Sequence, residues 1–435
     1  MTPGIRLISL VGLLALAGIG VAFFPASALA WKIAAGLVVL IACFDIVFLL
    51  GTKAPRLQRR APASMALATW TDIGLELQGN PQSRRMRVRV FDHHPQSFLA
   101  PDLPLDCIIE PGEVADLEYQ GRATERGPQQ FAGCEIRIAS PFGLWWRQRF
   151  IDIQSTAHVY PNYSTISNLL AYAVDPQSQI TGVRLSRRRG EGIEFHQLRD
   201  YREGDSLRSV DWKATARMGR LIAREYQDER DQQVVFLLDA GRRMLAKDDE
   251  LAHFDHALNA MLLLSYVAIR QGDSAGVMTA GSERTWLPPR KGADAINGLL
   301  NHVYDIQPKP IEIDYIAAAT ELTLKQRRRS LIIILSNARE EDSEELRIAT
   351  NLLRRRHLVI LASLRESALD EALAHDVHSF DDAVLYAATN QYLDARRESH
   401  KLLQAGGVFV EDCLCAELPA AITNRYLAIK RAGLL

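Results

Sequence analysis

The first fifty residues constrain this 435-residue chain most, because they form two long apolar stretches separated by a single charge. No charged residue occurs from Leu7 to Trp31, and after Lys32 the only charged residue before Lys53 is Asp45. Each stretch offers about 18 strongly apolar positions, close to the ~20 that cross a ~30 Å hydrocarbon core. We therefore predict two membrane helices, at about residues 7–25 and 33–50.

The alternative to two spans is a cleaved signal peptide followed by one helix. Ala26-Ser27-Ala28 resembles a cleavage site. Against this alternative, the preceding basic region is weak, the apolar region is long, and a second span follows at once. The link around Pro25 to Trp31 is too short to hold a domain, so we expect the two spans to form a tight hairpin.

Basic residues gather at the outer ends of this hairpin and predict its orientation. One precedes the first span, four follow the second and only Lys32 lies in the turn; the five outer ones are Arg6, Lys53, Arg56, Arg59 and Arg60. The positive-inside rule puts both termini, and the rest of the chain, in the cytoplasm. Asp45 is expected near the interface or paired within the hairpin; the alternative is a polar contact to another membrane subunit.

Charge and cysteine usage exclude several classes of protein. The net charge is -1, from 51 basic and 52 acidic residues, so no overall excess favours a nucleic-acid partner. The five cysteines include no C-x-x-C pair and no Cys/His cluster at zinc spacing. They fit a reducing compartment and predict no structural metal.

After a basic linker at 53–64, residues 65–160 alternate apolar and polar side chains with period two. Ile73, Leu75 and Leu77 alternate with Gly74 and Glu76, which is typical of strands with one buried face. Six or seven short strands fit this length. We predict a small all-β unit resembling an immunoglobulin-like sandwich.

Residues 161–230 form a connector that is dense in charges of both signs. Asp200, Asp205 and Asp211 are interleaved with Arg199, Arg202, Arg208 and Arg217, which predicts a folded ion-pair network. Asp211 also precedes a run of good helix formers. Two interpretations stay open, a solvated salt-bridged segment and a docking surface.

The run from Gly190 to Arg217 resembles the domain-of-unknown-function 58 family. The positions that carry the resemblance, and that we take as candidate interaction residues, are Gly190, Glu191, Gly192, Glu194, Phe195, Arg199, Tyr201, Gly204, Asp205, Arg208, Asp211, Trp212, Lys213 and Arg217. The Ser140–Leu144 segment and Arg224-Glu225-Tyr226 also match. The resemblance implies a membrane hairpin in the bacterial inner membrane, a β-sandwich and a von Willebrand factor A-like α/β domain. Family members typically occur beside MoxR-type AAA+ ATPases and are thought to work with them.

Residues 231–435 alternate short apolar runs with amphipathic segments. Strands are expected at 233–238, 276–279, 285–287, 331–335, 358–361 and 407–410, with helices at 249–270, 293–304, 314–327, 342–355, 381–404 and from about 418. This alternation predicts a doubly wound, mostly parallel α/β sheet. Ligands of such sheets bind at the carboxyl ends of strands, here near Asp239 and Asn337.

The metal-binding form of the von Willebrand A domain needs Asp-x-Ser-x-Ser after its first strand. This chain has Asp239-Ala240-Gly241-Arg242-Arg243, so only the aspartate remains. Mg²⁺ prefers hard oxygen ligands, and the two arginines bring positive charge instead. We expect no cofactor and no bound metal. Asp239 is expected to pair with one of these arginines or to cap the next helix.

The chain contains no P-loop, no G-x-S-x-G and no H-E-x-x-H. The first hypothesis is a non-enzymatic membrane-anchored adaptor, with a MoxR-type ATPase as partner in assembly or maturation of envelope proteins; other membrane or envelope proteins are further possible partners. The second is an enzyme in which Asp205 or Asp211 acts as base and Arg217 holds an anion. The third is a metal-dependent ligand-binding domain of the adhesive kind.

Overall fold

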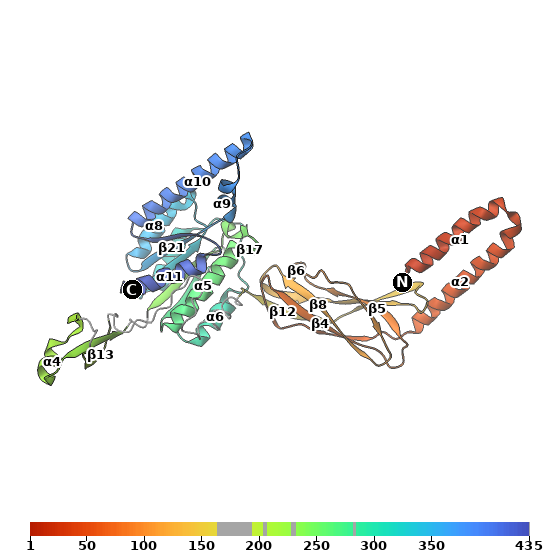
Figure 1. Ribbon diagram of the computed structural model, residues 1–435, viewed down its shortest axis with the longest axis horizontal. Coiled ribbons are helices and arrows are strands. Elements are labelled where there is room, and N and C mark those ends of the chain that lie inside the picture. The colour runs from red at the N-terminus through yellow and green to blue at the C-terminus, as the bar shows by residue number, and fades with distance from the viewer. Residues whose placement is uncertain (163–193, 203–206, 228–231, 282–283, 435) are drawn as a thin grey trace. The chain divides into compact units, whose positions relative to one another are not determined.

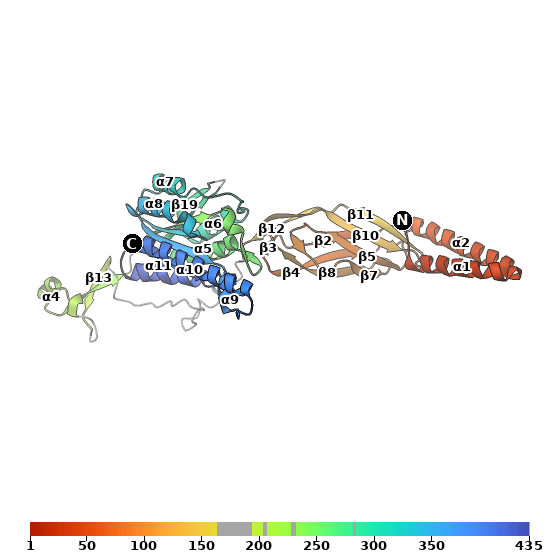
Figure 2. The same cartoon turned by 90° about the horizontal axis from the view of Figure 1, so that it is seen from above.

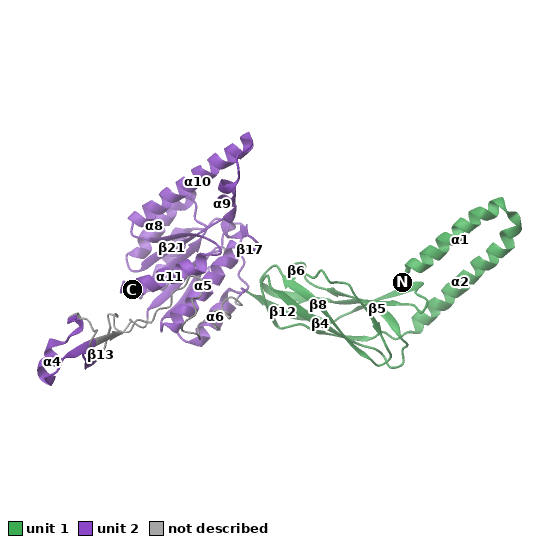
Figure 3. Ribbon diagram, in the orientation of Figure 1, with its two compact units in different colours: residues 1–160 green, residues 161–435 purple. Residues whose placement is uncertain are grey.

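The computed structural model, drawn in Figure 1, describes residues 1–162, 194–202, 207–227, 232–281 and 284–434. The chain divides into two compact units, Met1–Tyr160 and Pro161–Leu435 (Figure 3). Each unit is described by itself below.

The first unit begins with a helical hairpin. Helices α1 (Ile5–Phe23) and α2 (Ala28–Gly51) lie side by side (Figure 2) and are joined by a 3₁₀ turn at Pro25–Ser27. Both helices are long and apolar enough to cross a membrane, judged by length and composition. The second helix begins earlier than predicted, because one short turn reverses the chain. Trp31 then lies inside α2, where its indole Nε1 donates to the Leu14 carbonyl (2.9 Å).

The β unit follows the hairpin and confirms the period-two pattern, since Ile73, Leu75 and Leu77 are all buried. Its sheets have the orders β1-β11-β10-β5-β7, β2-β4-β8-β6 and β3-β12-β9. The strands are β1 (Thr2–Pro3), β2 (Arg56–Arg60), β3 (Ser64–Ala66), β4 (Trp70–Gln78), β5 (Met86–His93), β6 (Phe98–Leu99), β7 (Leu105–Ile109), β8 (Val114–Ala123), β9 (Gly127–Phe131), β10 (Gly133–Ala139), β11 (Trp145–Ile151) and β12 (Ser155–Tyr160).

This unit departs from the sequence prediction in two respects. There are more strands than the six or seven expected, and the segment predicted as a basic linker contains β2, which pairs with β4. Arg59 of β2 is buried and forms an ion pair with the buried carboxylate of Asp92. The Tyr119 hydroxyl donates to the same carboxylate (2.8 Å). Leu57 and Arg59 are two positions apart on β2, and both side chains are buried. The charged Arg59 can occupy an inward-facing position because it has a buried carboxylate as its partner.

The second unit contains a six-stranded sheet of order β19-β18-β15-β20-β21-β22, parallel except for β19. The predicted alternation of strands and helices is confirmed. The strands are β15 (Gln233–Asp239), β18 (Ser274–Ala280), β19 (Trp286–Arg290), β20 (Leu331–Ser336), β21 (Leu358–Arg365) and β22 (Phe409–Leu414). The helices are α5 (His253–Arg270), α6 (Ala293–Val303), α7 (Tyr315–Lys325), α8 (Ser343–Arg354), α9 (Ser367–Ala374), α10 (Phe380–Ala405) and α11 (Leu418–Arg431).

Helix α5 begins four residues later than predicted, because a small hairpin of β16 (Lys247–Asp248) and β17 (Leu251–Ala252) precedes it. Asp249, at the turn of this hairpin, has a positive φ of 55°. Such a conformation is common in tight turns and absent from helix interiors.

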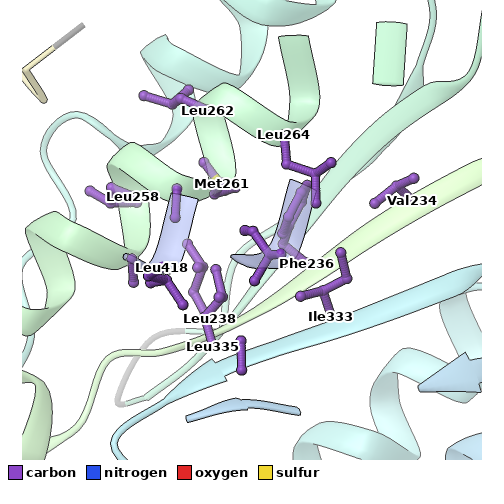
Figure 4. Close-up of a cluster of buried hydrophobic side chains, with 14 of the residues drawn as sticks. Val234, Phe236, Leu238, Leu258, Met261, Leu262, Leu264, Ile333, Leu335 and Leu418 are labelled. Atoms are coloured by element: carbon purple, nitrogen blue, oxygen red, sulfur yellow. The ribbon is translucent and has the colours of Figure 1, made fainter. Parts of the chain in front are cut away.

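Helices cover both faces of the sheet, and alternate residues of each strand enter different cores. Val234, Phe236 and Leu238 pack against α5 and α11 in one core (Figure 4). Val235 and Leu237 enter the other, with residues of α7 and α8. Because both faces are covered, the strands are continuously apolar, as expected for a buried parallel sheet.

Within residues 194–227 of the connector, the structure describes a small β-α-β element. Strand β13 (Glu194–Asp200) pairs antiparallel with β14 (Ile222–Gln227), and between them lie a 3₁₀ turn at Leu207–Ser209 and helix α4 (Trp212–Met218).

Candidate functional site

The carboxyl ends of β15 and β20 form the predicted site. The two strands are neighbours in the sheet, but the chain continues from β15 to β18 on one side and from β20 to β21 on the other. Their following loops therefore diverge, and a crevice opens at this switch point. Asp239 is the last residue of β15 and Ser336 the last of β20.

Asp239 is buried, with 3% of its surface exposed, and its carboxylate accepts three hydrogen bonds. Oδ2 accepts from the hydroxyls of Ser336 (2.6 Å) and Tyr315 (2.8 Å), and Oδ1 accepts from the backbone N–H of Gly241 (2.8 Å). Burial raises the pKa of Asp239, and these hydrogen bonds oppose that rise.

The two arginines after Asp239 do not hydrogen-bond to it, which corrects one of the two expectations for this residue. Arg242 pairs with Glu312 (2.9 Å), and Arg243 pairs with Glu341 (2.6 Å) and Asp342. These acidic partners come from other loops, and both arginines still line the cavity at the strand end. Asp239 also does not cap a long helix; it closes the turn before the 3₁₀ segment Arg242–Leu245.

A cavity of about 190 Å³ opens at this strand end, lined by Asp239, Arg242, Arg243, Tyr315 and Glu345 among others. These residues do not fit a divalent cation. Both oxygens of the Asp239 carboxylate already accept N–H or O–H donors, and the Arg243 guanidinium adds positive charge, whereas Mg²⁺ needs six oxygen ligands. The cavity instead presents hydroxyl, carboxylate and guanidinium groups to the surface.

A second polar cluster lies at the ends of β20, β21 and β22, and its centre is Arg396 of α10, only 1% exposed. Its guanidinium donates to the carbonyls of Ala338 (2.7 Å) and Leu364 (2.7 Å) and to the Ser363 hydroxyl (2.7 Å). It also pairs with Asp412 (2.9 Å). The cluster ties α10 to three strands.

Asn337 extends this cluster toward α5. Its Nδ2 donates to Glu366 Oε1 (2.7 Å) and lies 3.3 Å from His253 Nδ1. Burial lowers the pKa of His253, which favours a neutral ring that accepts this bond. Burial alone tends to raise the pKa of Glu366, but hydrogen bonds from Asn337 and its own backbone, with Arg339, reverse the effect and lower it. The sequence predicts Asn337 at this edge of the sheet but not its partners His253 and Glu366, which carry no local signal.

The structure describes part of the predicted interaction set. Gly190, Glu191, Gly192, Gly204 and Asp205 lie outside the described residues. Glu194 and Phe195 are placed on β13 and Arg208 in the 3₁₀ turn, by backbone only. The remaining members lie on the β13–α4–β14 element: Arg199, Tyr201, Asp211, Trp212, Lys213 and Arg217.

Asp211 begins α4, as predicted. Its carboxylate accepts from the Ala214 N–H (2.9 Å) and from Arg224 Nε (2.9 Å). Both bonds lower the pKa of Asp211, and the backbone bond from Ala214 has the larger effect. Val210 bridges to Ala223 of β14, and this places Asp211 beside Arg224. The helix ends at Gly219, whose left-handed φ of 65° suits a residue without a side chain.

Two ion pairs among the described residues of this element involve arginines that the prediction did not name. Asp211 pairs with Arg224, and Asp200 pairs with Arg220 (3.2 Å). Both arginines come from the strand and turn after α4, because the antiparallel register sets Asp200 opposite Ile222.

Large apolar side chains are exposed on the same element. Leu207 is 71% exposed, Trp212 67% and Met218 61%. In a segment of this size two strands and one short helix bury little apolar surface of their own. Contiguous exposed apolar patches mark interaction surfaces, so these three side chains are the candidates for such a surface on this element.

The comparisons with known proteins bear on this part of the chain. The family model described as "Protein of unknown function DUF58" matches residues 197–390. The resemblance to this family is confirmed over that segment. The matched segment begins inside β13 and ends inside α10. It therefore includes most of the β13–α4–β14 element, as well as Asp239 and Asn337, and it stops before Arg396.

A curated relative and two solved structures are also similar. The "Uncharacterized protein YeaD" of Bacillus subtilis is 24% identical over 193 residues, which are 43% of this chain and 44% of the relative. An aerotolerance-related membrane protein from Bacteroides fragilis is 16% identical over 30% of this chain and 67% of its own, with a TM-score of 0.24. An alpha-2-macroglobulin from Escherichia coli is 18% identical over 26% and 17%, with a TM-score of 0.22. At these scores neither structure informs the fold.

Proposed function

We propose that this protein is a membrane-anchored, non-enzymatic adaptor that binds a MoxR-type AAA+ ATPase through its β13–α4–β14 element and assists the assembly or maturation of envelope proteins. The hairpin spans the bacterial inner membrane twice, with both termini in the cytoplasm. The parallel-sheet domain is of the von Willebrand factor A-like type.

The observation that carries the proposal is the exposed apolar trio Leu207, Trp212 and Met218. Trp is enriched among the residues that dominate binding energy at interfaces. The trio lies on an element whose backbone is fixed by the Asp211 cap and the Asp211–Arg224 pair. A partner with an apolar groove gains most of its contact area from these side chains.

The contacts of Asp211 favour the adaptor over the enzyme alternative. One oxygen of its carboxylate is bound to the Ala214 N–H and the other to Arg224, and both bonds hold it ionised. A general base works best with a pKa near the working pH, whereas the pKa of Asp211 is lowered. The role of Asp211 in local folding supports a binding surface.

The test is capture of the ATPase from detergent-solubilised membranes with the full chain as bait. Replacing both Trp212 and Met218 by Ser should lower the recovered ATPase at least tenfold, because two large exposed apolar side chains of the element are lost. Leu324→Ser is the matched control, since Leu324 is 70% exposed on α7, outside the element.

Equal recovery with the double variant and the control would contradict the assignment of this element. Recovery of no AAA+ ATPase by the unmodified chain would contradict the adaptor function itself. If calorimetric titration with Mg²⁺ gives binding heat for the unmodified chain and none for Asp239→Ala, the metal-dependent alternative is favoured.

A further inference from the structure

A groove of about 830 Å³ lies within the first unit, where the open ends of the hairpin meet the Ser140–Leu144 turn. Its walls are apolar residues of both helices and of the turn, among them Leu10, Leu40, Phe44 and Phe142. Arg6, in the first turn of α1, lies at the rim. From Arg6 to Leu10 the groove runs one turn along the helix, about 6 Å.

The turn that closes the groove is held in place by Asp45 of α2. This carboxylate is fully buried and accepts from the backbone N–H groups of Phe142 (3.0 Å) and Leu144 (3.3 Å). The Gly4 N–H donates to the Leu144 carbonyl (2.7 Å). The wall of the groove is therefore fixed to both helices.

Arg6 has donor capacity left over. Its Nη1 donates to the Phe142 carbonyl (3.1 Å), and the ion pairs of the described residues include none with Arg6. A guanidinium carries five N–H donors, so several remain for an anion. The first turn of α1 contains no acidic residue, and the positive end of the helix dipole adds to the attraction.

More positive charge surrounds the same end of α2. Arg147 Nη1 donates to the carbonyls of Leu49 (3.3 Å), Leu50 (3.1 Å) and Thr52 (3.2 Å), and Arg84 stacks over the Phe48 ring at 4.6 Å. The cytoplasmic leaflet carries anionic lipids that such juxtamembrane charges attract.

We propose that this groove binds one anionic phospholipid of the cytoplasmic leaflet, with its phosphate on Arg6 and an acyl chain against Leu10, Leu40 and Phe44. The proposal rests on the membrane insertion proposed above. A lipid fits better than a free anion, because the groove below Arg6 is apolar. It fits better than a protein segment, because the groove opens on the hairpin surface that faces the hydrocarbon in a membrane.

The experiment is native mass spectrometry of the full chain in detergent micelles doped with phosphatidylglycerol or phosphatidylcholine. One phosphatidylglycerol should bind at least tenfold more tightly than phosphatidylcholine. Arg6→Gln should remove this preference, because Arg6 is the charged residue among the described residues that line the groove. Leu10→Trp should weaken both lipids by filling the groove.

Lys32→Gln is the matched control, because Lys32 lies at the opposite end of α2 and should leave lipid binding unchanged. An unchanged preference in Arg6→Gln, an equal loss in Lys32→Gln, competition by inorganic phosphate, or a protein chain in place of the lipid would each overturn the proposal.

Hydrogen exchange of the Phe142 and Leu144 amides shows whether Arg6→Gln keeps the fold of the groove. If the exchange is altered, the variant Arg6→Lys takes its place, because lysine keeps the positive charge. This variant should retain the preference for phosphatidylglycerol, and loss of the preference in Arg6→Lys would count against the proposal. ATPase capture by the same variants separates the outcomes, since it should remain intact if only the lipid site fails.

Discussion

At the scale of single residues, two aspartates show how the surroundings decide the charge of a carboxyl group. Asp211 is surrounded by an N–H donor and a guanidinium, so its pKa is lowered. Asp239 lies in the core beside hydroxyl groups, so burial outweighs its hydrogen bonds and its pKa is raised. Asp211 therefore stabilises the folded state when ionised, whereas ionisation of Asp239 works against the fold.

Asp239→Asn should change the pH dependence of stability. A carboxyl whose folded pKa lies above its unfolded value of about 3.9 contributes less stability as the pH rises from that value through the folded pKa. Asparagine does not titrate, so this loss should disappear. Thermal unfolding should show that the variant loses less stability between pH 4.5 and pH 7.5 than the unmodified chain does. A pH dependence identical to that of the unmodified chain would contradict the raised pKa.

At the scale of elements, a buried charged side chain adds specific polar contacts between a helix and the rest of its unit in two places. Helix α10 is held to the sheet by Arg396, and α2 is held to the Ser140–Leu144 turn by Asp45. In both cases a buried charged side chain bonds to backbone groups that belong to another element. Removing one partner of such a contact leaves buried groups without hydrogen bonds.

Arg396→Ala should destabilise the α/β sheet domain by about 3–5 kcal/mol, because Asp412 and two backbone carbonyls lose their donor. Chemical unfolding of the full chain in detergent measures the loss. Arg397→Ala is the control: Arg397 is exposed and pairs only with Asp394 within the same helix (2.7 Å), so its effect should stay within about 0.5 kcal/mol. Similar losses in the two variants would contradict a special role of Arg396.

Asp45→Ala should weaken the attachment of the Ser140–Leu144 turn to α2 by a free energy of about 2–4 kcal/mol, since two hydrogen bonds to the carboxylate disappear. Exchange of the Phe142 and Leu144 amides, measured by mass spectrometry, should become faster by at least tenfold. Asp45→Asn keeps one acceptor oxygen and should give an intermediate rate. Unchanged exchange in Asp45→Ala would show that other contacts hold the turn.

These contacts also mark the limit of what the sequence predicts. Local patterns predict the alternation of Ile73, Leu75 and Leu77, the apolar run of β20 and the Asp211 helix start, because each depends on neighbours in the sequence. The partner of Asp45 lies 97 residues away, and Tyr315 reaches Asp239 across 76 residues. Such pairings depend on tertiary packing, so a lone aspartate gives no local signal of its partner.

At the scale of the whole molecule, the membrane hairpin proposed above would set the side of the membrane on which the other parts reside. The orientation stays a prediction from flanking charge, and Arg59, one of those charges, is buried in the folded β unit. The positive-inside rule acts during insertion, when the strands have not yet formed, so Arg59 still counts for orientation.

Cysteine labelling in intact cells tests the orientation. A cysteine at Ser27, in the turn of the hairpin, should react with a membrane-impermeant maleimide from outside. A cysteine at Glu110, exposed at the end of β7, should react only after permeabilisation. The unmodified chain, with its five native cysteines, gives the background. Labelling of Glu110→Cys in intact cells would contradict the predicted orientation.

The strand before the hairpin has a consequence for synthesis. Thr2 and Pro3 form β1, and their partners Trp146 and Trp145 lie on β11. At about 5–20 residues per second, the ribosome makes β11 roughly 7–30 seconds after β1. Both apolar helices leave the ribosome during that interval. Thr2 and Pro3 are therefore translated long before the strand that they pair with, and they are among the last residues of their sheet to find a partner.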